Sequence, residues 1–282
     1  MSGKLVVVGT PIGNLGDLSP RAVEAMEQAD FIAAEDTRVT LKLLNHFGIK
    51  KPMVSYFEHN KRERGEIICT RIQQGETCVL VSDAGMPAIS DPGEELVRQC
   101  AEQGIPVTVV PGPSAVVSAL AISGLPTGRF TFEGFLSMNK KSRRDHLQQV
   151  ARESRTMVFY EAPHKLPNTL QDMLDAWGDR RIAIVRELTK VHEEVIRTTL
   201  SEAAQRYAQG GARGEIVLVI EGAPLSQASD SYTPEEAVAL ARTYMEEGNS
   251  ASDAAKQAAK MTGIKKGSIY RGLIEGEKGQ LE

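Results

Sequence analysis

Short β-branched runs alternate with helix-like stretches through the first 125 residues, and no other feature limits the possible folds of this chain as strongly. The strand-like runs lie at 5–9, 31–34, 54–57, 77–82 and 107–111. The first helix-like stretch begins at Ser19-Pro20, which is typical of an N-cap followed by proline at the first helical position. Strands joined through helices form right-handed β-α-β crossovers, so a largely parallel sheet covered on both faces is predicted.

The pattern changes in the second half of the chain. Further strand candidates lie at 130–136, 156–162, 181–188, 193–200 and 214–222. The two within 181–200 have no long helix between them, which predicts a hairpin and therefore a mixed sheet. A polar linker at 224–231 leads to helical stretches, the last two joined by a turn with glycine, which is the outline of a helix-turn-helix. We therefore predict two α/β domains, 1–125 and 126–224, followed by a small helix-turn-helix domain at 233–282.

The composition is ordinary for a globular protein, with 41% hydrophobic and 25% charged residues. A membrane span needs a run of about 18 apolar residues, and the chain has none. Cys69, Cys78 and Cys100 are widely spaced and lie in apolar patterns, which favours buried, reduced thiols over a disulfide framework or a zinc site. We expect a cytoplasmic protein without a membrane span or a metal site.

The net charge of −4 conceals two basic islands. Their cations are Lys140, Lys141, Arg143 and Arg144 in the middle of the chain, and Lys265, Lys266 and Arg271 near its end. A basic island on an acidic chain can mark contact with a polyanion, although a run of charge is more often a solvated face. Charge alone leaves both interpretations open.

Three loops rich in small residues follow predicted strands of the first half. Their sequences are GTPIGNLGD (9–17), SDAGMPAISDPG (82–93) and PGPSA (111–115). None contains a Walker phosphate loop or the G-x-G-x-x-G pattern of dinucleotide-binding proteins. The carboxyl ends of parallel strands meet at one edge of a sheet, where open α/β folds bind ligands. The three loops together therefore predict one shared pocket.

Together with four further motifs, these loops resemble the ribosomal RNA branch of the tetrapyrrole-methylase superfamily. The further motifs are AAEDTR (33–38), VFYEAPHK (158–165), RELTK (186–190) and RGEIVLVIEG (213–222). The resemblance covers nearly the whole chain, including the C-terminal helix-turn-helix. It implies that S-adenosylmethionine (SAM) binds in a cleft between the two α/β domains, usually in a homodimer. It also implies methyl transfer to the ribose 2′-hydroxyl of a cytidine in 16S rRNA, within the small ribosomal subunit.

Cofactor contacts of the superfamily carry over where the motifs match. The matching positions are Pro11, Ala84, Gly85, Met86, Ile89, Ser114, Ala115, Glu161 and Leu188. Two positions depart from the tetrapyrrole members. This chain has Ala84-Gly85-Met86 where they usually have a second Gly-Asp combination, and Glu161 where they have an apolar residue. The departures argue against a porphyrinoid substrate.

The implied reaction requires a proton acceptor, because a ribose 2′-hydroxyl is a poor nucleophile until it loses its proton. The candidates near the predicted cleft are Asp36, His59 and Glu161, followed by Glu35, Glu187 and Lys190. Asp36 could equally hold Arg38 in a structural ion pair, and His59 could be a hydrogen-bonding residue of a loop. The sequence leaves the identity of the base open.

Our hypothesis is that the two basic islands contact RNA. Phosphate contacts through them would make affinity fall as salt rises. Two rival functions remain: methylation of a tetrapyrrole precursor, and non-catalytic regulation through nucleic-acid binding by the helix-turn-helix. The regulator leaves the α/β part of the chain without a role, and titration with SAM would separate it from either enzyme.

Overall fold

The computed structural model describes residues 3–210, 212–224, 232–246 and 248–278. The chain forms two compact units, one of residues 1–151 and 155–222 and the other of residues 152–154 and 223–282. Apart from Pro224, the predicted linker at 224–231 lies outside the described residues.

The first sheet is parallel throughout and has the strand order β3-β2-β4-β1-β5. Its strands are β1 (Lys4–Val8), β2 (Phe31–Ala34), β3 (Met53–Ser55), β4 (Thr77–Val81) and β5 (Val107–Val110). The helices between them are α1 (Pro20–Gln28), α2 (Thr37–His46), α3 (Lys61–Gln73) and α4 (Gly93–Glu102), with a short 3-10 helix, η1 (Leu15–Asp17), before α1. The predicted strand and helix positions agree with these elements to within a few residues.

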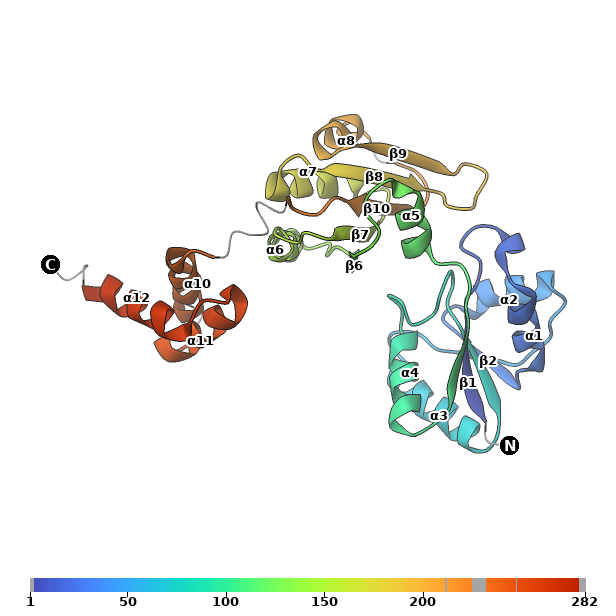
Figure 1. Cartoon of the computed structure of the whole chain (residues 1–282). Coiled ribbons are helices and arrows are strands. Elements are labelled where there is room, and N and C mark those ends of the chain that lie inside the picture. Colours follow the sequence, from blue (N-terminus) through green and yellow to red (C-terminus); the bar gives the residue numbers. More distant parts are fainter. Residues whose placement is uncertain (1–2, 211, 225–231, 247, 279–282) are drawn as a thin grey trace. The chain divides into compact units, whose positions relative to one another are not determined.

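Both faces of this sheet are buried because apolar side chains occupy successive positions of each central strand. On β1, Val6 and Val8 pack in a cluster with Met26 of α1. Leu5 on the opposite face packs in a cluster with Ile68 of α3. Figure 1 shows α1 and α2 on one side of the sheet and α3 and α4 on the other. The predicted parallel sheet covered on both faces is confirmed.

The second sheet is mixed and has the order β6-β7-β10-β8-β9. Its strands are β6 (Phe130–Phe135), β7 (Thr156–Glu161), β8 (Arg181–Arg186), β9 (Glu194–Thr199) and β10 (Ile216–Ile220). Only β6 and β7 pair in parallel, and β8 and β9 form the predicted antiparallel hairpin. One face packs against α6 (Lys140–Gln149), α7 (Leu166–Trp177) and α8 (Leu200–Tyr207).

The other face of the second sheet is covered by α5 (Ala115–Ser123), although the sequence groups this helix with the first half. Ala119 and Leu120 of α5 lie in one apolar cluster with Val217 of β10. The helix is apolar all round, so its sequence has no polar face to show which sheet it covers. The chain therefore passes from the first sheet to the second before α5 begins.

The C-terminal unit contains three helices, α10 (Pro234–Glu246), α11 (Ala251–Thr262) and α12 (Lys266–Lys278). Thr233 and Glu236 form a capping box, each side chain accepting the other's backbone N–H (3.2 and 3.0 Å). Gly263 ends α11 at φ 71° and turns the chain into α12, as a helix-turn-helix requires. The core of the unit consists largely of alanines, with Ile269 and Leu273 of α12 buried among them.

Cys69, Cys78 and Cys100 are buried, as predicted. Across the described ranges, no helix is both long enough and apolar enough to cross a membrane.

Candidate active site

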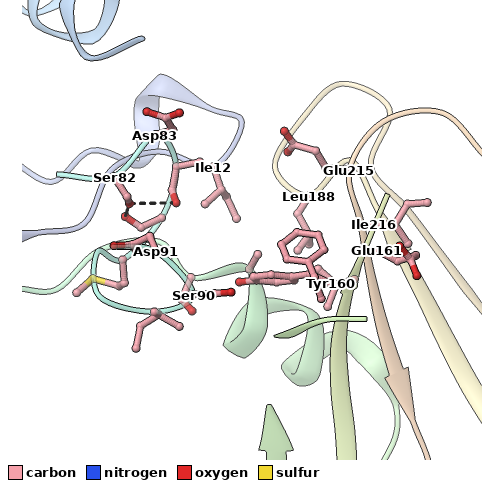
Figure 2. A pocket seen from close by; sticks show the side chains of 18 of the residues that line it. Ile12, Ser82, Asp83, Ser90, Asp91, Tyr160, Glu161, Leu188, Glu215 and Ile216 are labelled. Carbon is pink, nitrogen blue, oxygen red and sulfur yellow. Dashed lines mark hydrogen bonds between the residues drawn. The ribbon is translucent and has the colours of Figure 1, made fainter. Parts of the chain in front are cut away.

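A cavity of about 500 Å³ lies where the loops at the carboxyl edge of the first sheet face the second sheet. Figure 2 shows Ser82, Asp83 and Asp91 on one side of it, and Tyr160, Glu161 and Glu215 on the other. The lining residues are Ile12, Glu35, Ser82, Asp83, Ala84, Gly85, Met86, Ile89, Ser90, Asp91, Ser114, Ala115, Phe135, Tyr160, Glu161, Ala162, Pro163, Val185, Leu188, Gly214, Glu215, Ile216 and Val217.

The small residues of the three predicted loops allow their backbones to meet. Thr10 and Gly85 exchange two backbone hydrogen bonds (2.9 and 3.1 Å), which joins the loop after β1 to the loop after β4. At the third loop, a Cβ on Gly112 would lie 2.8 Å from the Cα of Gly9, and a Cβ on Gly9 would lie 2.7 Å from the Cα of Gly112, so both positions require glycine. The Gly112 N–H also donates to the sulfur of Met86 (3.3 Å). The predicted meeting of the loops is therefore observed.

The loop after β4 has a strained backbone. Ala88 and Ser90 have φ values of 67° and 68°, which non-glycine residues rarely adopt. Asp91 holds this conformation, because its Oδ1 accepts the N–H groups of Ala88 (3.0 Å) and Gly93 (2.7 Å). Ile89 lies between the strained residues and is 50% exposed while lining the cavity. Strain of this kind concentrates at ligand sites, where the surrounding structure maintains it.

The opposite wall is held by a network of charges. Lys190 pairs with Glu187 (3.0 Å) and with Glu215 of the lining (3.1 Å). Glu187 also accepts the backbone N–H of Glu215 (2.9 Å), and this bond, followed by the one from Lys190, lowers the pKa of Glu187. Glu187 and Thr189 have positive φ values of 50° and 64°. The RELTK loop is therefore a second strained segment beside the cavity.

The cavity is electronegative. Its ionisable groups include the carboxyls of Glu35, Asp83, Asp91, Glu161 and Glu215, and within the described chain none of its lining residues is lysine or arginine. Burial, followed by the charges of Asp83 and Asp91, raises the pKa of Glu35. A cationic ligand is therefore favoured here over an anionic one.

Of the predicted cofactor-binding residues, all except Pro11 line this cavity. Pro11 lines a second cavity next to it. The predicted set omitted Asp83, Asp91, Tyr160 and Glu215, although each lies in or beside a motif that the sequence singles out. Asp83 and Asp91 are the two carboxylates of SDAGMPAISDPG, so the motif itself carried the signal.

The predicted catalytic residues lie in different surroundings. Asp36 caps α2 and pairs with Arg38 (2.6 Å), and the hydrogen bond from Arg38 lowers the pKa of Asp36 to about 2. His59 is exposed in a turn before α3, with its ring edge-on to Phe57. Neither residue lines either cavity.

Glu161 lines the larger cavity but is 3% exposed, and its two carboxylate oxygens are both engaged. One accepts the Ala162 N–H (2.7 Å) and the other the Thr169 hydroxyl (2.5 Å). These bonds fix the turn from β7 toward α7.

The residues predicted to bind RNA differ in how free their charges are. Arg143 is only 11% exposed and pairs with buried Asp172 (2.6 Å), which Arg144 also contacts (3.0 Å). Lys140 and Lys141, in the first turn of α6, are exposed. In the C-terminal unit, Lys265 and Arg271 are exposed, and Lys266 donates to the Ser252 hydroxyl (3.0 Å).

A parallel and a mixed α/β sheet with this cavity between them form the fold seen in solved methyltransferase structures. The chain belongs to this family, the tetrapyrrole (corrin/porphyrin) methylases, whose family model matches residues 4–204. The resemblance seen in the motifs is thereby confirmed, and the chain is a methyltransferase.

Within that family, the chain is similar to proteins named ribosomal RNA small subunit methyltransferase I. It is 45% identical to the one from Synechocystis sp., with 97% of this chain and 98% of the relative covered. It is 48% identical to the one from Thermotoga maritima, with 78% of this chain and 99% of the relative covered. Among solved structures, uroporphyrin-III C-methyltransferase from Thermus thermophilus complexed with S-adenosyl homocysteine shares the fold. That match has a TM-score of 0.55 at 21% identity and covers 78% of this chain and 97% of that structure.

Proposed function

We propose that the protein transfers a methyl group from SAM to the ribose 2′-hydroxyl of a cytidine in 16S rRNA of the small ribosomal subunit. The observation that carries this proposal is the similarity to ribosomal RNA small subunit methyltransferases I. It extends over 97% of the chain at 45% identity for the Synechocystis protein and over 99% at 43% for the one from Haemophilus influenzae. The tetrapyrrole-methylating structures resemble the chain at about half that identity, which supports a shared fold only.

The residues of the larger cavity fit SAM as the cofactor. Its volume, about 500 Å³, lies in the range of small-molecule sites. Its carboxylates suit a ligand with a sulfonium and an ammonium group, and the small residues Ala84 and Gly85 also line it. We assign cofactor binding to the predicted set, Pro11, Ala84, Gly85, Met86, Ile89, Ser114, Ala115, Glu161 and Leu188. When bound, SAM supplies an electrophilic methyl group on a positively charged sulfur.

The chain itself must exclude water and position the acceptor hydroxyl. The apolar side chains of Ile12, Ile89 and Leu188 line the cavity and limit its hydration. Placing the hydroxyl in line at about 3–3.5 Å from the methyl group supplies much of the rate enhancement. Asp36, His59 and Glu161 remain the base candidates from the sequence, and the geometry of the cavity adds Asp83.

The RNA contacts that we propose are the members of the two basic islands that make no ion pair with Asp172, namely Lys140 and Lys141 on α6 and the three cations of the C-terminal unit. The rRNA substrate implies a cytoplasmic protein. We also propose a homodimer, which is supported by the unusually exposed Val109 on edge strand β5 and Val117 on α5 (53% and 56%). Light scattering of the purified chain would measure the oligomeric state.

The decisive experiment incubates the purified chain with methyl-labelled SAM and 30S subunits that lack the modification. Label should appear in 16S rRNA at the ribose of one cytidine, mapped by nuclease digestion and mass spectrometry. A tetrapyrrole precursor in parallel reactions serves as the competing substrate. Label in the tetrapyrrole but not in rRNA would contradict the proposal.

A further inference from the structure

A second cavity, of about 350 Å³, lies beside the larger one. The two share Ile12, Ser82, Asp83 and Ala84 as lining residues. The other residues that line the second cavity are Thr10, Pro11, Gly13, Asn14, Leu15, Val39, Thr40, Lys42 and Leu43. They come from the loop after β1 and from α2, and we call this space the loop cavity.

The loop cavity combines exposed apolar side chains with one cation. Leu15 and Val39 are 43% and 39% exposed although both are aliphatic. Lys42 is exposed, and the described part of the chain offers it no ion pair. Apolar surface next to a lysine suits a nucleotide, because the faces of a base pack against apolar side chains while the phosphate pairs with the cation.

Asn14 adds a hydrogen-bonding group at the same place. Its Oδ1 accepts the Gly16 N–H (3.0 Å), which orients the side chain. Its NH₂ group makes no hydrogen bond within the ranges that the structure describes, and it can donate to a ring nitrogen or carbonyl oxygen of a base.

Asp83 lines both cavities. Its Oδ1 accepts the backbone N–H of Asp36 (2.9 Å), so the carboxylate is held in place. Oδ2 has no hydrogen-bond partner among the described residues. The larger cavity is the proposed cofactor site, and a methyl acceptor must lie at its edge. The Asp83 carboxylate is therefore within reach of both the cofactor and a nucleotide in the loop cavity.

We propose that the loop cavity receives the target nucleotide of the RNA, with its base against Leu15 and Val39, its phosphate at Lys42 and its ribose at Asp83. This inference rests on the proposed function. The 2′-oxygen forms a bond to the methyl carbon as its O–H bond breaks and the proton passes to Asp83 Oδ2. The carbon–sulfur bond breaks at the same time, and its electron pair stays on sulfur.

Substitutions of Lys42 and Val39 test whether the loop cavity binds the nucleotide, because neither residue lines the larger cavity. Lys42→Ala should raise the KM for 30S subunits several-fold and lower the salt slope of binding by about one, while the affinity for SAM by calorimetry stays unchanged. Val39→Asp should raise the same KM. Lys50→Ala removes an equally exposed lysine elsewhere and should change neither quantity. Unchanged KM values for both cavity variants would overturn the proposal.

The role of Asp83 has a separate readout. Asp83→Asn should lower kcat by about 100-fold or more, because a positioned base contributes at least that factor. A kcat of Asp83→Asn within a few-fold of the wild-type value would exclude Asp83 as the proton acceptor.

Direct occupancy can be measured by NMR with cytidine 5′-monophosphate as the probe and S-adenosylhomocysteine present. The methyl signals of Val39 and Leu43 should shift in the wild-type chain and shift less in Lys42→Ala. Shifts confined to other residues would overturn the assignment even if methyl transfer is normal. A wild-type chain that labels no rRNA would instead defeat the proposed function, and this separates the two failures.

Discussion

At the scale of single residues, the structure separates charges that hold the fold from charges that are free to bind. The sequence placed Arg143 with Lys140 in one basic island, yet Arg143 is 11% exposed and neutralises buried Asp172. Hydrogen bonds from Arg143 and Arg144 outweigh the effect of burial and lower the pKa of Asp172. Spacing along α6 shows that both cations are present, but it does not reveal a carboxylate contributed by α7.

Arg143→Ala should therefore destabilise the protein, because it leaves the Asp172 carboxylate buried without its main partner. Removal of one member of a buried pair typically costs about 3 kcal/mol or more of unfolding free energy. Urea denaturation would measure the loss. Lys140→Ala, on the same helix but exposed, provides the control and should leave the unfolding free energy nearly unchanged. Equal effects of the two substitutions would show that the Asp172 contact is weak.

The ionisation of Glu35 makes the stability of the protein depend on pH. Its ordinary pKa of 4.5 is raised in the folded protein by burial and by the neighbouring carboxylates. A carboxyl with a raised folded pKa contributes stability that is complete below the unfolded pKa and is lost as pH rises through the folded pKa.

Glu35→Gln removes this loss, so the variant should be more stable than the wild type near pH 7, and the difference should vanish below about pH 4. Thermal unfolding followed across pH would show this. Glu66→Gln, at an exposed position of α3, controls for the removal of one carboxylate. A difference between Glu35→Gln and wild type that grows toward acid pH would have the wrong sign for this explanation.

At the scale of secondary-structure elements, the carboxyl edge of the first sheet depends on close backbone contact. A Cβ at Gly112 would lie within 2.9 Å of backbone atoms of Gly9, which cannot move aside as a flexible side chain can. Gly112→Ala should cost about 1–3 kcal/mol of stability and weaken SAM binding, since the loop that holds Met86 must shift. Gly128→Ala meets no atom within 4 Å and should do neither. Calorimetry with SAM would measure the binding effect.

Most elements of the fold could be predicted from the sequence because their signals are local. Ser19-Pro20 marks the start of α1, and Thr233 with Glu236 marks the start of α10, through hydrogen bonds made within a few residues. The position of α5 could not be predicted, because its apolar residues surround the helix and leave no polar face to show which sheet it covers. The site could likewise be predicted only in part. The loop motifs predicted the larger cavity. The loop cavity also depends on side chains of α2, and no sequence motif connects these with Asn14.

At the scale of the whole molecule, the two compact units differ in how far the relatives share them. The Thermotoga maritima relative is covered to 99% of its length by 78% of this chain, and the uncovered remainder is about as long as residues 223–282. The family model likewise ends at residue 204. That relative, which is named ribosomal RNA small subunit methyltransferase I, is thus about as long as the α/β unit alone. This comparison supports a role for the C-terminal unit other than methyl transfer.

The positive charge of part of the C-terminal unit favours a role in binding RNA. Residues 254–274, which span most of α11 and the start of α12, contain Lys256, Lys260, Lys265, Lys266 and Arg271 but no carboxylate. Such a stretch on a chain of net charge −4 suits the phosphates of RNA. Alanine substitution of Lys265, Lys266 and Arg271 together should lower the salt slope of 30S binding by up to about three and raise the KM.

The same triple variant should keep the wild-type kcat at saturating substrate, because none of the three residues lines either cavity. Alanine at three exposed cations of the α/β unit, Arg21, Lys50 and Arg129, removes the same net charge and serves as the matched control. Initial rates across subunit concentration and salt would separate KM from kcat. A fall in kcat with an unchanged salt slope would mean that the C-terminal unit acts on the reaction itself rather than on RNA affinity.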